Sequence, residues 1–520
     1  MPISRSVRLL GPAVALALFA AGCTDDSPGP DSAPDDSRPS ASGAAPSSLD
    51  WKRCGRPTPE QGGGDAPGRL ADGTRWECAT LKVPLDYGEP GGKQIGIALI
   101  RARAKDSGRR IGSLVYNFGG PGGSGVALLP QLAEEYEKLR GRYDLVSFDP
   151  RGVGASAPVH CLDDEETDDY RTVDGTPDDA AEEREALAAS REQADACEKN
   201  SGDLLPYLTT AATARDMDRI RAALGDDKLH YFGISYGTEL GGVYAHLFPK
   251  RVGRAVFDAV VDPTQDAVAS SLAQAKGFEL ALTDYMADCA EEEGDDCPTG
   301  PGGAEGRRRI LALLDRVDSD PLPASGGRRL TEGDAVTGIV AALYSKESWP
   351  YLTEGLQEAG RGQGRILLAL ADFYMERSDD GDYSNQGPAN LAVNCADSAE
   401  RFTAAQARRQ AAAFAGEAPV FGGLLGWSLL ACTDWPVEGD SAHLRVDAPG
   451  APPILVVGNT GDPATPYEGA ARMARELGVG VRLTYHGEGH GAYGQSDCVD
   501  GTVEDYLLQG KVPRDGKECR

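Results

Sequence analysis

Short apolar runs recur along the first half of the chain and again near its end, and longer segments with a helical spacing of apolar positions lie between them. This alternation of strand-like and helix-like patterns is typical of an α/β protein with a mostly parallel sheet. The apolar runs predict an eight-stranded sheet, with strands at 77–83, 95–101, 113–118, 143–148, 229–232, 255–261, 453–457 and 481–486.

The strand-like pattern stops between residues 264 and 449. Apolar positions in this stretch keep a helical spacing and predict five helices, at 273–289, 307–317, 333–343, 366–375 and 404–415. A block of helices placed between two strands predicts a cap inserted into the sheet domain. We therefore expect a core in two parts, 51–263 and 450–520, with 264–449 as the helical cap.

The first 23 residues have the composition of an export signal. Two arginines precede an apolar stretch, and a small-residue processing site ends at Cys23. This site resembles a bacterial lipobox, in which the cysteine is lipidated and becomes N-terminal after cleavage. Alanine stands where the lipobox usually has leucine, so cleavage without lipidation and full secretion stay open as an alternative. Residues 24–50 are rich in Asp, Ser, Pro and Ala, which predicts a disordered linker.

Charge and composition restrict the partners of the folded part. The 520-residue chain is 40% hydrophobic, which is enough for a large core, and its formal net charge is −29. Such a negative charge argues against binding to nucleic acid or to an anionic membrane surface. Membrane contact is therefore expected only through a lipid at Cys23, on a protein that is either anchored at the cell surface or secreted.

Ten cysteines remain when Cys23 is set aside. An even number in an exported chain favours disulfides, and no Cys-x-x-Cys spacing indicates a zinc site. The simplest hypothesis pairs neighbours along the chain, although sequence alone does not decide the connectivity. These pairs are Cys54 with Cys78, Cys161 with Cys197, Cys289 with Cys297, Cys395 with Cys432, and Cys498 with Cys519.

Ser235 lies in a Gly-x-Ser-x-Gly pentapeptide between a predicted strand and a predicted helix. This setting is that of a nucleophile elbow, in which a strained turn exposes the serine and leaves no room for side chains at the flanking positions. The alternative is a Gly-Ser turn that caps a helix. The strand before the motif and the helix after it favour the nucleophile.

A glycine-rich segment, 117–125, follows the third predicted strand. Backbone N–H groups in such a loop can approach a developing oxyanion closely, and we assign this role to the N–H groups of Gly120 and Tyr236. A phosphate-binding loop is the competing interpretation, but the lysine that this motif requires is missing. A plain flexible turn is the other alternative.

The candidate base is His490, one of only six histidines, in a glycine-rich loop after the last predicted strand. In the chain order serine, acid, histidine, the only other candidates are His443 and His486. The candidate acid is Asp462, in a turn-rich loop directly after the strand at 453–457, where it would orient the imidazole. An Asx-turn before proline is the alternative for this residue.

Asp258 and Asp262, on the strand at 255–261 or just after it, are the rival acids. Thr465 either bonds the Asp462 carboxylate or caps the next helix, and the sequence favours neither role.

Five motifs in order carry a family resemblance: 117–125, 148–156, 233–238, 462–466 and 489–491. Together, over about residue 50 to the C-terminus, they resemble the exported tripeptidyl aminopeptidases of actinobacteria, which are relatives of proline iminopeptidase. The resemblance implies an α/β-hydrolase core, a helical cap, and release of short peptides from the free N-termini of peptides or proteins. Proline iminopeptidases carry histidine before Gly-Gly-Pro-Gly, whereas this chain has phenylalanine.

The resemblance assigns the same catalytic residues as the motifs do: Ser235, Asp462 and His490, with Gly120 and Tyr236 at the oxyanion. Neither a metal nor an organic cofactor is expected. A carboxylesterase or lipase uses the same machinery and is the alternative enzyme, and an inactive hydrolase-fold lipoprotein that only binds is the alternative outside enzymes. An exopeptidase must also bind a charged amino group.

Asp397 is the candidate for that amine-binding role because the adjacent Cys395 would hold it in place, and an exposed helix-capping aspartate is the alternative.

Overall fold

The computed structural model describes residues 49–520. The predicted signal segment, the lipidation site Cys23 and nearly all of the predicted linker therefore lie outside the described residues. Within the described part no helix is both long and apolar enough to cross a bilayer.

All eight predicted strands are present, and two short strands extend the sheet at its edges to ten. The eight are β2 (Glu77–Pro84), β3 (Gln94–Ala102), β4 (Gly112–Asn117), β5 (Tyr143–Phe148), β6 (Leu229–Ile234), β7 (Val252–Asp258), β10 (Ile454–Gly461) and β11 (Gly480–Glu488). The two edge strands are β1 (Lys52–Arg53) and β12 (Lys517–Cys519). Each is too short and too polar to produce an apolar run, so neither could be predicted from the sequence.

The strand order is β1-β2-β3-β5-β4-β6-β7-β10-β11-β12. The pairs from β1 to β5 are antiparallel, and every pair from β5 onward is parallel. The central strands β4 and β5 are buried at every residue, as expected for a sheet covered on both faces. Their carboxyl ends and that of β6 lead into the segments that carry the predicted chemistry.

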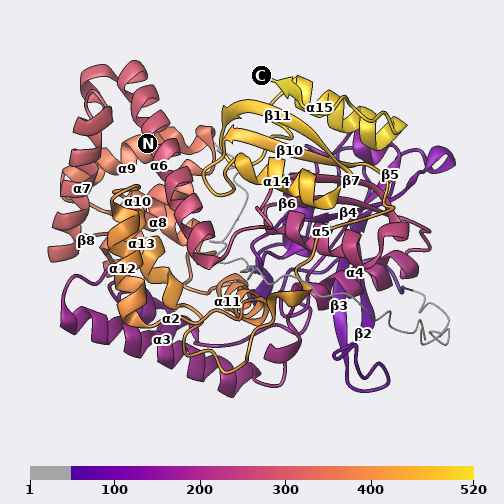
Figure 1. The fold of residues 1–520 in the computed structure, drawn as a ribbon, viewed down its shortest axis with the longest axis horizontal. Coiled ribbons are helices and arrows are strands. Elements are labelled where there is room, and N and C mark those ends of the chain that lie inside the picture. Colours follow the sequence, from indigo (N-terminus) through magenta and orange to yellow (C-terminus); the bar gives the residue numbers. More distant parts are fainter. Residues whose placement is uncertain (1–48) are drawn as a thin grey trace, which may run out of the picture.

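Helices cover both faces of the sheet. They are α1 (Gly125–Leu132), α4 (Thr210–Ala223), α5 (Tyr236–Leu247), α14 (Glu468–Leu477) and α15 (Asp497–Glu504). One hydrophobic cluster joins α4, α5 and α14 to the sheet, and a second joins α1 and α15 to it. The sheet with its helices forms the right part of the molecule in Figure 1.

The cap is a helical body beside the sheet, on the left in Figure 1, with a hydrophobic cluster of its own. Its helices are α6 (Ala267–Glu292), α7 (Gly303–Ser319), α8 (Glu332–Leu343), α9 (Trp349–Gly360), α10 (Arg365–Tyr374), α11 (Gln386–Asp397), α12 (Ala404–Ala415) and α13 (Gly422–Trp427). A short hairpin, β8 (Leu322–Pro323) and β9 (Arg329–Leu330), accompanies them. Each of the five predicted helices coincides with one of these elements, with 366–375 running one residue past the end of α10, and the sequence analysis has no counterpart of α9, α11 and α13.

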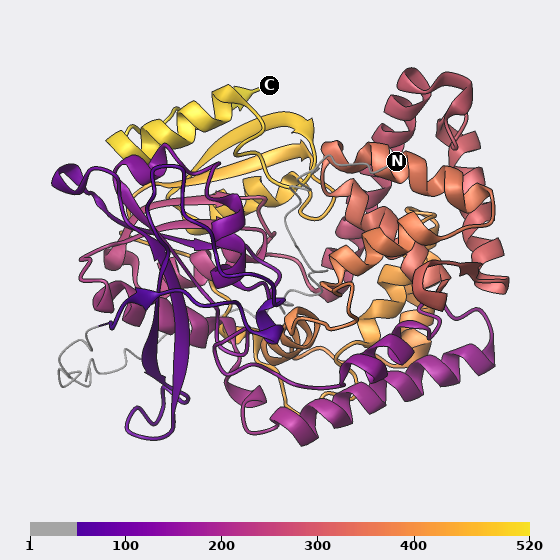
Figure 2. The same ribbon diagram turned by 180° about the vertical axis from the view of Figure 1, so that it is seen from behind.

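Two further helices, α2 (Asp164–Arg171) and α3 (Ala180–Ser201), precede the serine motif in the chain but run alongside the cap (Figure 2). Arg171 donates to Asp334 of α8 at 2.6 Å and to Asp372 of α10 at 2.9 Å. The segment 51–263 therefore contributes two helices to the cap side as well as most of the sheet.

The five sequential disulfides predicted from the cysteine spacing are all present. One of them, Cys395–Cys432, joins the end of α11 to the segment after α13. The others close loops within the core, within the cap, or between the ends of α15 and β12.

Candidate active site

Ser235 occupies a sharp turn between β6 and α5. Its φ is 56° and its ψ is −128°, a conformation that costs free energy in a residue with a β-carbon. The turn is held by the Ser235 N–H, which donates to the Asp258 carbonyl at 3.1 Å. Such strain at one serine between a strand and a helix is the geometry of a nucleophile elbow.

The glycines on either side of Ser235 are required by close packing. A β-carbon at Gly233 would lie 2.3 Å from the Gly237 carbonyl oxygen. A β-carbon at Gly237 would lie 2.5 Å from the Asn117 carbonyl oxygen. The elbow and the end of β4 therefore approach each other so closely that only glycine fits.

The glycine-rich loop after β4 lies directly against the elbow. A β-carbon at Gly119 would lie 2.8 Å from Ser235 Cβ and 3.3 Å from the Tyr236 nitrogen. Gly120 follows with φ +110°. Tyr236 is the first residue of α5, so its N–H has no acceptor within the helix. The two N–H groups assigned from the sequence thus lie on segments that touch at Ser235.

Two buried networks stabilise this region, and the first of them holds the glycine-rich loop in place. Asp149 accepts hydrogen bonds from the Ser124 hydroxyl at 2.7 Å and from the Val126 N–H at 3.1 Å, where α1 begins. The Arg151 guanidinium makes two 2.8 Å contacts with the Asp216 carboxylate. Arg151 and Asp216 are almost fully buried, so their pair fixes the segment after β5 against α4.

Asp462 and His490 form a fully buried pair. The Asp462 carboxylate lies 2.8 Å from His490 Nδ1, and neither side chain is exposed to solvent. The same carboxylate accepts hydrogen bonds from the N–H groups of Ala464, Thr465 and Gly491. A carboxylate held by this many donors fixes the orientation of the imidazole.

The other ring nitrogen, His490 Nε2, is buried and has no hydrogen-bond partner within residues 49–520. The cap covers the imidazole from one side. The backbone N–H of His490 donates to the Tyr344 carbonyl at 2.8 Å, and the centres of the two rings lie 5.2 Å apart. An unpaired nitrogen in such a place is costly unless a partner comes from elsewhere.

Asp258 connects the elbow to the histidine loop. Its carbonyl accepts the Ser235 N–H, and its carboxylate accepts the N–H groups of Ala492 and Tyr493. Burial raises the pKa of this carboxyl to about 6. These hydrogen bonds engage its carboxylate with backbone, and none of them reaches His490.

The second rival acid, Asp262, bonds Thr264 and pairs with Arg472 at 2.6 Å. Of the late histidines, His486 lies at a partly exposed strand end, 3.5 Å from Glu518. Of the three candidate acids, only Asp462 therefore contacts His490.

Thr465 contacts both members of the buried pair. Its N–H donates to Asp462 at 2.9 Å, and its hydroxyl lies 3.4 Å from His490 Nδ1. Of the two roles left open by the sequence, the structure shows the contact with the carboxylate.

Asp397 is the last residue of α11 and is buried rather than exposed. Its carboxylate accepts the Thr210 N–H at 3.0 Å, and the Thr210 hydroxyl lies 2.5 Å from the Tyr236 hydroxyl. Asp397 therefore reaches the first residue of α5 through one threonine. It caps α4 by accepting this N–H, but from inside the protein.

Glu239 is a residue of this region that the sequence reasoning missed. It lies on α5, the helix that follows Ser235, and only 8% of its surface is exposed. The signal was an acid in an otherwise apolar or small-residue helix start, directly after the serine motif.

One group of three acids within the described chain has oxygens close enough to share a metal ion. Asp174, Asp318 and Glu332 offer oxygens within 4.8 Å of one another, but they include none of the residues above. That the reaction needs no metal or cofactor stays a prediction.

Comparison with known proteins identifies the family. A model of the alpha/beta hydrolase fold matches residues 112–295, and a model of TAP-like proteins matches residues 418–519. Serine protease Hip1 of Mycobacterium tuberculosis is 40% identical over 468 residues, 85% of this chain and 87% of the relative. Carboxylesterase B of the same species is 39% identical over 456 residues, 85% and 86% of the two chains.

A third relative, tripeptidyl aminopeptidase of Streptomyces lividans, is 32% identical over 492 residues, 92% of this chain and 88% of the relative. A solved proline iminopeptidase from Mycobacterium smegmatis is 13% identical, with a TM-score of 0.38 over 83% of this chain and 98% of that chain. The last likeness is too distant to bear on function. The length and identity of the first three matches are decisive, and the chain belongs to the TAP-like family of α/β-hydrolase enzymes.

Proposed function

We propose that this protein is an exported serine exopeptidase that releases short peptides, with tripeptides as the first choice, from free N-termini. The observation that carries the proposal is the buried Asp462–His490 pair, whose unpartnered Nε2 belongs to a loop that Asp258 ties to the strained Ser235 turn. The relatives named serine protease and tripeptidyl aminopeptidase support a peptide substrate.

In this mechanism the Ser235 hydroxyl attacks the scissile carbonyl while its proton passes to His490 Nε2. Asp462 holds the imidazole with Nδ1–H donating, so that Nε2 is the basic nitrogen, and it stabilises the imidazolium that forms. The C–N bond then breaks, and the imidazolium returns the proton to the leaving amine. Water repeats the sequence on the acyl-enzyme and releases the peptide acid.

The N–H groups of Gly120 and Tyr236 stabilise the oxyanion of both tetrahedral intermediates in this proposal. Loss of one such donor costs about 10²–10³ in kcat in comparable sites. Gly120 has no side chain and a φ of 110°, and Tyr236 begins α5, so that its N–H has no acceptor within the helix; both facts support the assignment.

A carboxylesterase is the second candidate function, because one of the relatives carries that name. The test is a substrate panel: tri-alanine p-nitroanilide with a free amino group, its N-acetyl form, and p-nitrophenyl butyrate. An exopeptidase hydrolyses the free peptide far faster than the blocked one. Preference for the ester with no peptide turnover would favour the esterase, and no turnover of any substrate would favour a binding lipoprotein.

Export and anchoring are part of the same proposal. Five disulfides suit an oxidising compartment, and the proposed lipid at Cys23 would hold the enzyme at the cell surface through the linker. Expression of the full chain in an actinobacterial host tests this, with Cys23→Ala as the comparison. A lipidated protein partitions with membranes and loses this partitioning in the variant, whereas equal release of both proteins would mean simple secretion.

A further inference from the structure

Glu239 is a buried acid for which the proposed reaction has no use. It is the fourth residue after Ser235, which places it about 6 Å further along the axis of α5. Its carboxylate makes no hydrogen bond or ion pair within residues 49–520, although only 8% of the residue is exposed. An ionised carboxylate buried without a partner is so costly that a ligand or a proton must neutralise it.

A second buried acid, Asp397, acts on the same place from the cap side. Burial, together with the charge of Asp397, raises the pKa of Glu239 to about 8. Burial also raises the pKa of Asp397 itself to about 7, against the hydrogen bonds from Thr210. Burial, with smaller contributions from the charges of both acids, raises the pKa of the Tyr236 phenol, whose hydroxyl contacts the Thr210 hydroxyl. The two carboxyls thus share one poorly solvated region beside the elbow.

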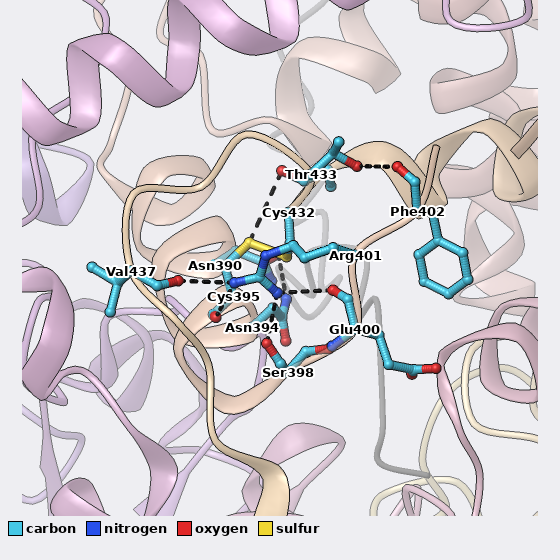
Figure 3. The surroundings of a disulfide bond; sticks show 11 residues. Asn390, Asn394, Cys395, Ser398, Glu400, Arg401, Phe402, Cys432, Thr433 and Val437 are labelled. Atoms are coloured by element: carbon cyan, nitrogen blue, oxygen red, sulfur yellow. Dashed lines mark hydrogen bonds between the residues drawn. A yellow bond between two sulfur atoms is a disulfide. The ribbon is translucent and has the colours of Figure 1, made fainter. Parts of the chain in front are cut away.

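The cap holds Asp397 firmly in this position. Figure 3 shows the disulfide between Cys395 and Cys432 next to the end of α11. The Arg401 guanidinium donates to four carbonyl groups around it, those of Cys395, Ser398, Glu400 and Val437. A disulfide and a guanidinium at one helix end restrict its motion, so the acid at that end is a fixed feature of the site.

We propose that Glu239 and Asp397 bind the α-ammonium group of the peptide substrate, a role that rests on the exopeptidase function proposed above. An ammonium ion supplies the positive charge that both carboxyls lack and the hydrogen-bond donors that Glu239 lacks. An extended peptide advances about 3.3–3.6 Å per residue, so an amino group two or three residues before the scissile carbonyl lies about 6–10 Å from it. An acid that binds the amine of a short peptide must therefore lie about this far from the scissile carbonyl, whereas one that binds the amine of a single residue must lie closer.

Steady-state kinetics of the full chain test the proposal. Glu239→Gln and Asp397→Asn keep the shape of each side chain and remove its charge. They should raise KM for tri-alanine p-nitroanilide by about tenfold or more, since a charged hydrogen bond is lost. Turnover of p-nitrophenyl butyrate, which has no amine, should fall much less than turnover of the peptide in both variants. The control is Glu332→Gln, a half-buried acid of the cap outside this region, which should alter neither substrate.

A binding measurement gives an answer even if these variants fold poorly. The Ser235→Ala protein is titrated calorimetrically with tri-alanine amide and with its N-acetyl form, in buffers of different ionisation enthalpy. Because the acids bind a proton in the empty site and lose it to pair with an ammonium, binding of the free amine near neutral pH should release protons. Absence of proton release, or equal affinity for both ligands, would overturn the proposal.

The outcomes separate the two proposals. If the unmodified enzyme cleaves free and N-acetylated peptides equally well, the exopeptidase function is wrong and the amine site falls with it. If the enzyme requires a free amine and Glu239→Gln keeps that requirement undiminished, the exopeptidase function stands and the assignment of Glu239 is wrong.

Discussion

Asp462, the proposed catalytic acid, and Glu239, the proposed amine-binding acid, differ in their hydrogen-bond partners. Asp462, on the core, accepts hydrogen bonds from His490 and from three backbone N–H groups. Glu239, on the helix after the nucleophile, accepts none within the described chain, and the cap places Asp397 near it. A fully bonded acid positions a neighbour permanently, whereas an unbonded one awaits a partner. In the two proposals above, Asp462 therefore serves the chemistry and Glu239 serves the selection of the substrate.

The largest expected effect is on the proposed catalytic residues Ser235, Asp462 and His490. Ser235→Ala should lower kcat by at least about 10³. The activity that remains comes from the oxyanion donors and from substrate binding. A fluorophosphonate probe should form its adduct on Ser235, as read by peptide mass spectrometry. Labelling of another serine, or retained turnover in the variant, would remove the nucleophile from this elbow.

The pairing of Asp462 with His490 gives the next effect. Asp462→Asn should lower kcat about a thousandfold because the amide favours the wrong imidazole tautomer, and His490→Ala should be nearly as damaging as loss of the serine. Asp258→Asn is the matched control, since its carboxylate bonds only backbone N–H groups near His490. A larger loss from Asp258→Asn, in a protein that still folds, would move the acid to β7.

The buried Glu239 carboxyl, which has no hydrogen-bond partner within the described chain, predicts a pH effect on stability. Burial raises the pKa of Glu239 to about 8, whereas a glutamate in an unfolded chain titrates near about 4.3. Between these values the folded protein keeps a proton that the unfolded chain has released, so stability falls as pH rises. Glu239→Gln abolishes this contribution.

Thermal melts at about pH 5 and about pH 8 measure the effect. The variant should gain about 2–4 °C on the unmodified protein at the higher pH relative to the lower one. Tyr236, Asp397 and Asp440 also act on this region, and they are present in both proteins. Glu165→Gln, at an exposed position of α2, is the control. An equal difference at both pH values would mean that Glu239 is not held protonated by the fold.

The smallest effect concerns the disulfide at the end of α11. Replacing Cys395 and Cys432 by serine should cost about 2–4 kcal/mol of stability and should also raise KM for free-amine peptides, because Asp397 loses its anchor. Replacing Cys498 and Cys519, at the edge of the core, should cost stability alone. If both pairs change the preference for free amines equally, the disulfide near Asp397 has no special part in binding.

The sheet, the Ser235 turn and the positions of Asp462 and His490 could be predicted because each leaves a local signal in the sequence. Buried strands are apolar runs, and the elbow needs glycines at fixed spacing around Ser235. The acid and the histidine follow in a known chain order, after β10 and β11. The edge strands β1 and β12 escaped because two or three polar residues form no pattern.

The region around Asp397 and Glu239 was less predictable, because its geometry depends on contacts between the cap and α5, which are distant in the sequence. α11 carries polar residues along with its apolar ones and shows no clean helical stripe, so its position over the glycine-rich loop was not foreseen. The disulfide beside Asp397 is present as its neighbouring cysteine suggested, and the amine-binding role of Asp397 stays a prediction. Glu239 was missed because a sequence does not tell which acid of a helix a cap will bury.

The most direct test of the account is the ratio of kcat/KM for tri-alanine p-nitroanilide to that for its N-acetyl form, measured with the unmodified enzyme. A site that meets the amine with buried, otherwise unpaired acids should favour the free peptide by about 100-fold or more. A ratio near one, with both peptides cleaved efficiently, would contradict the account.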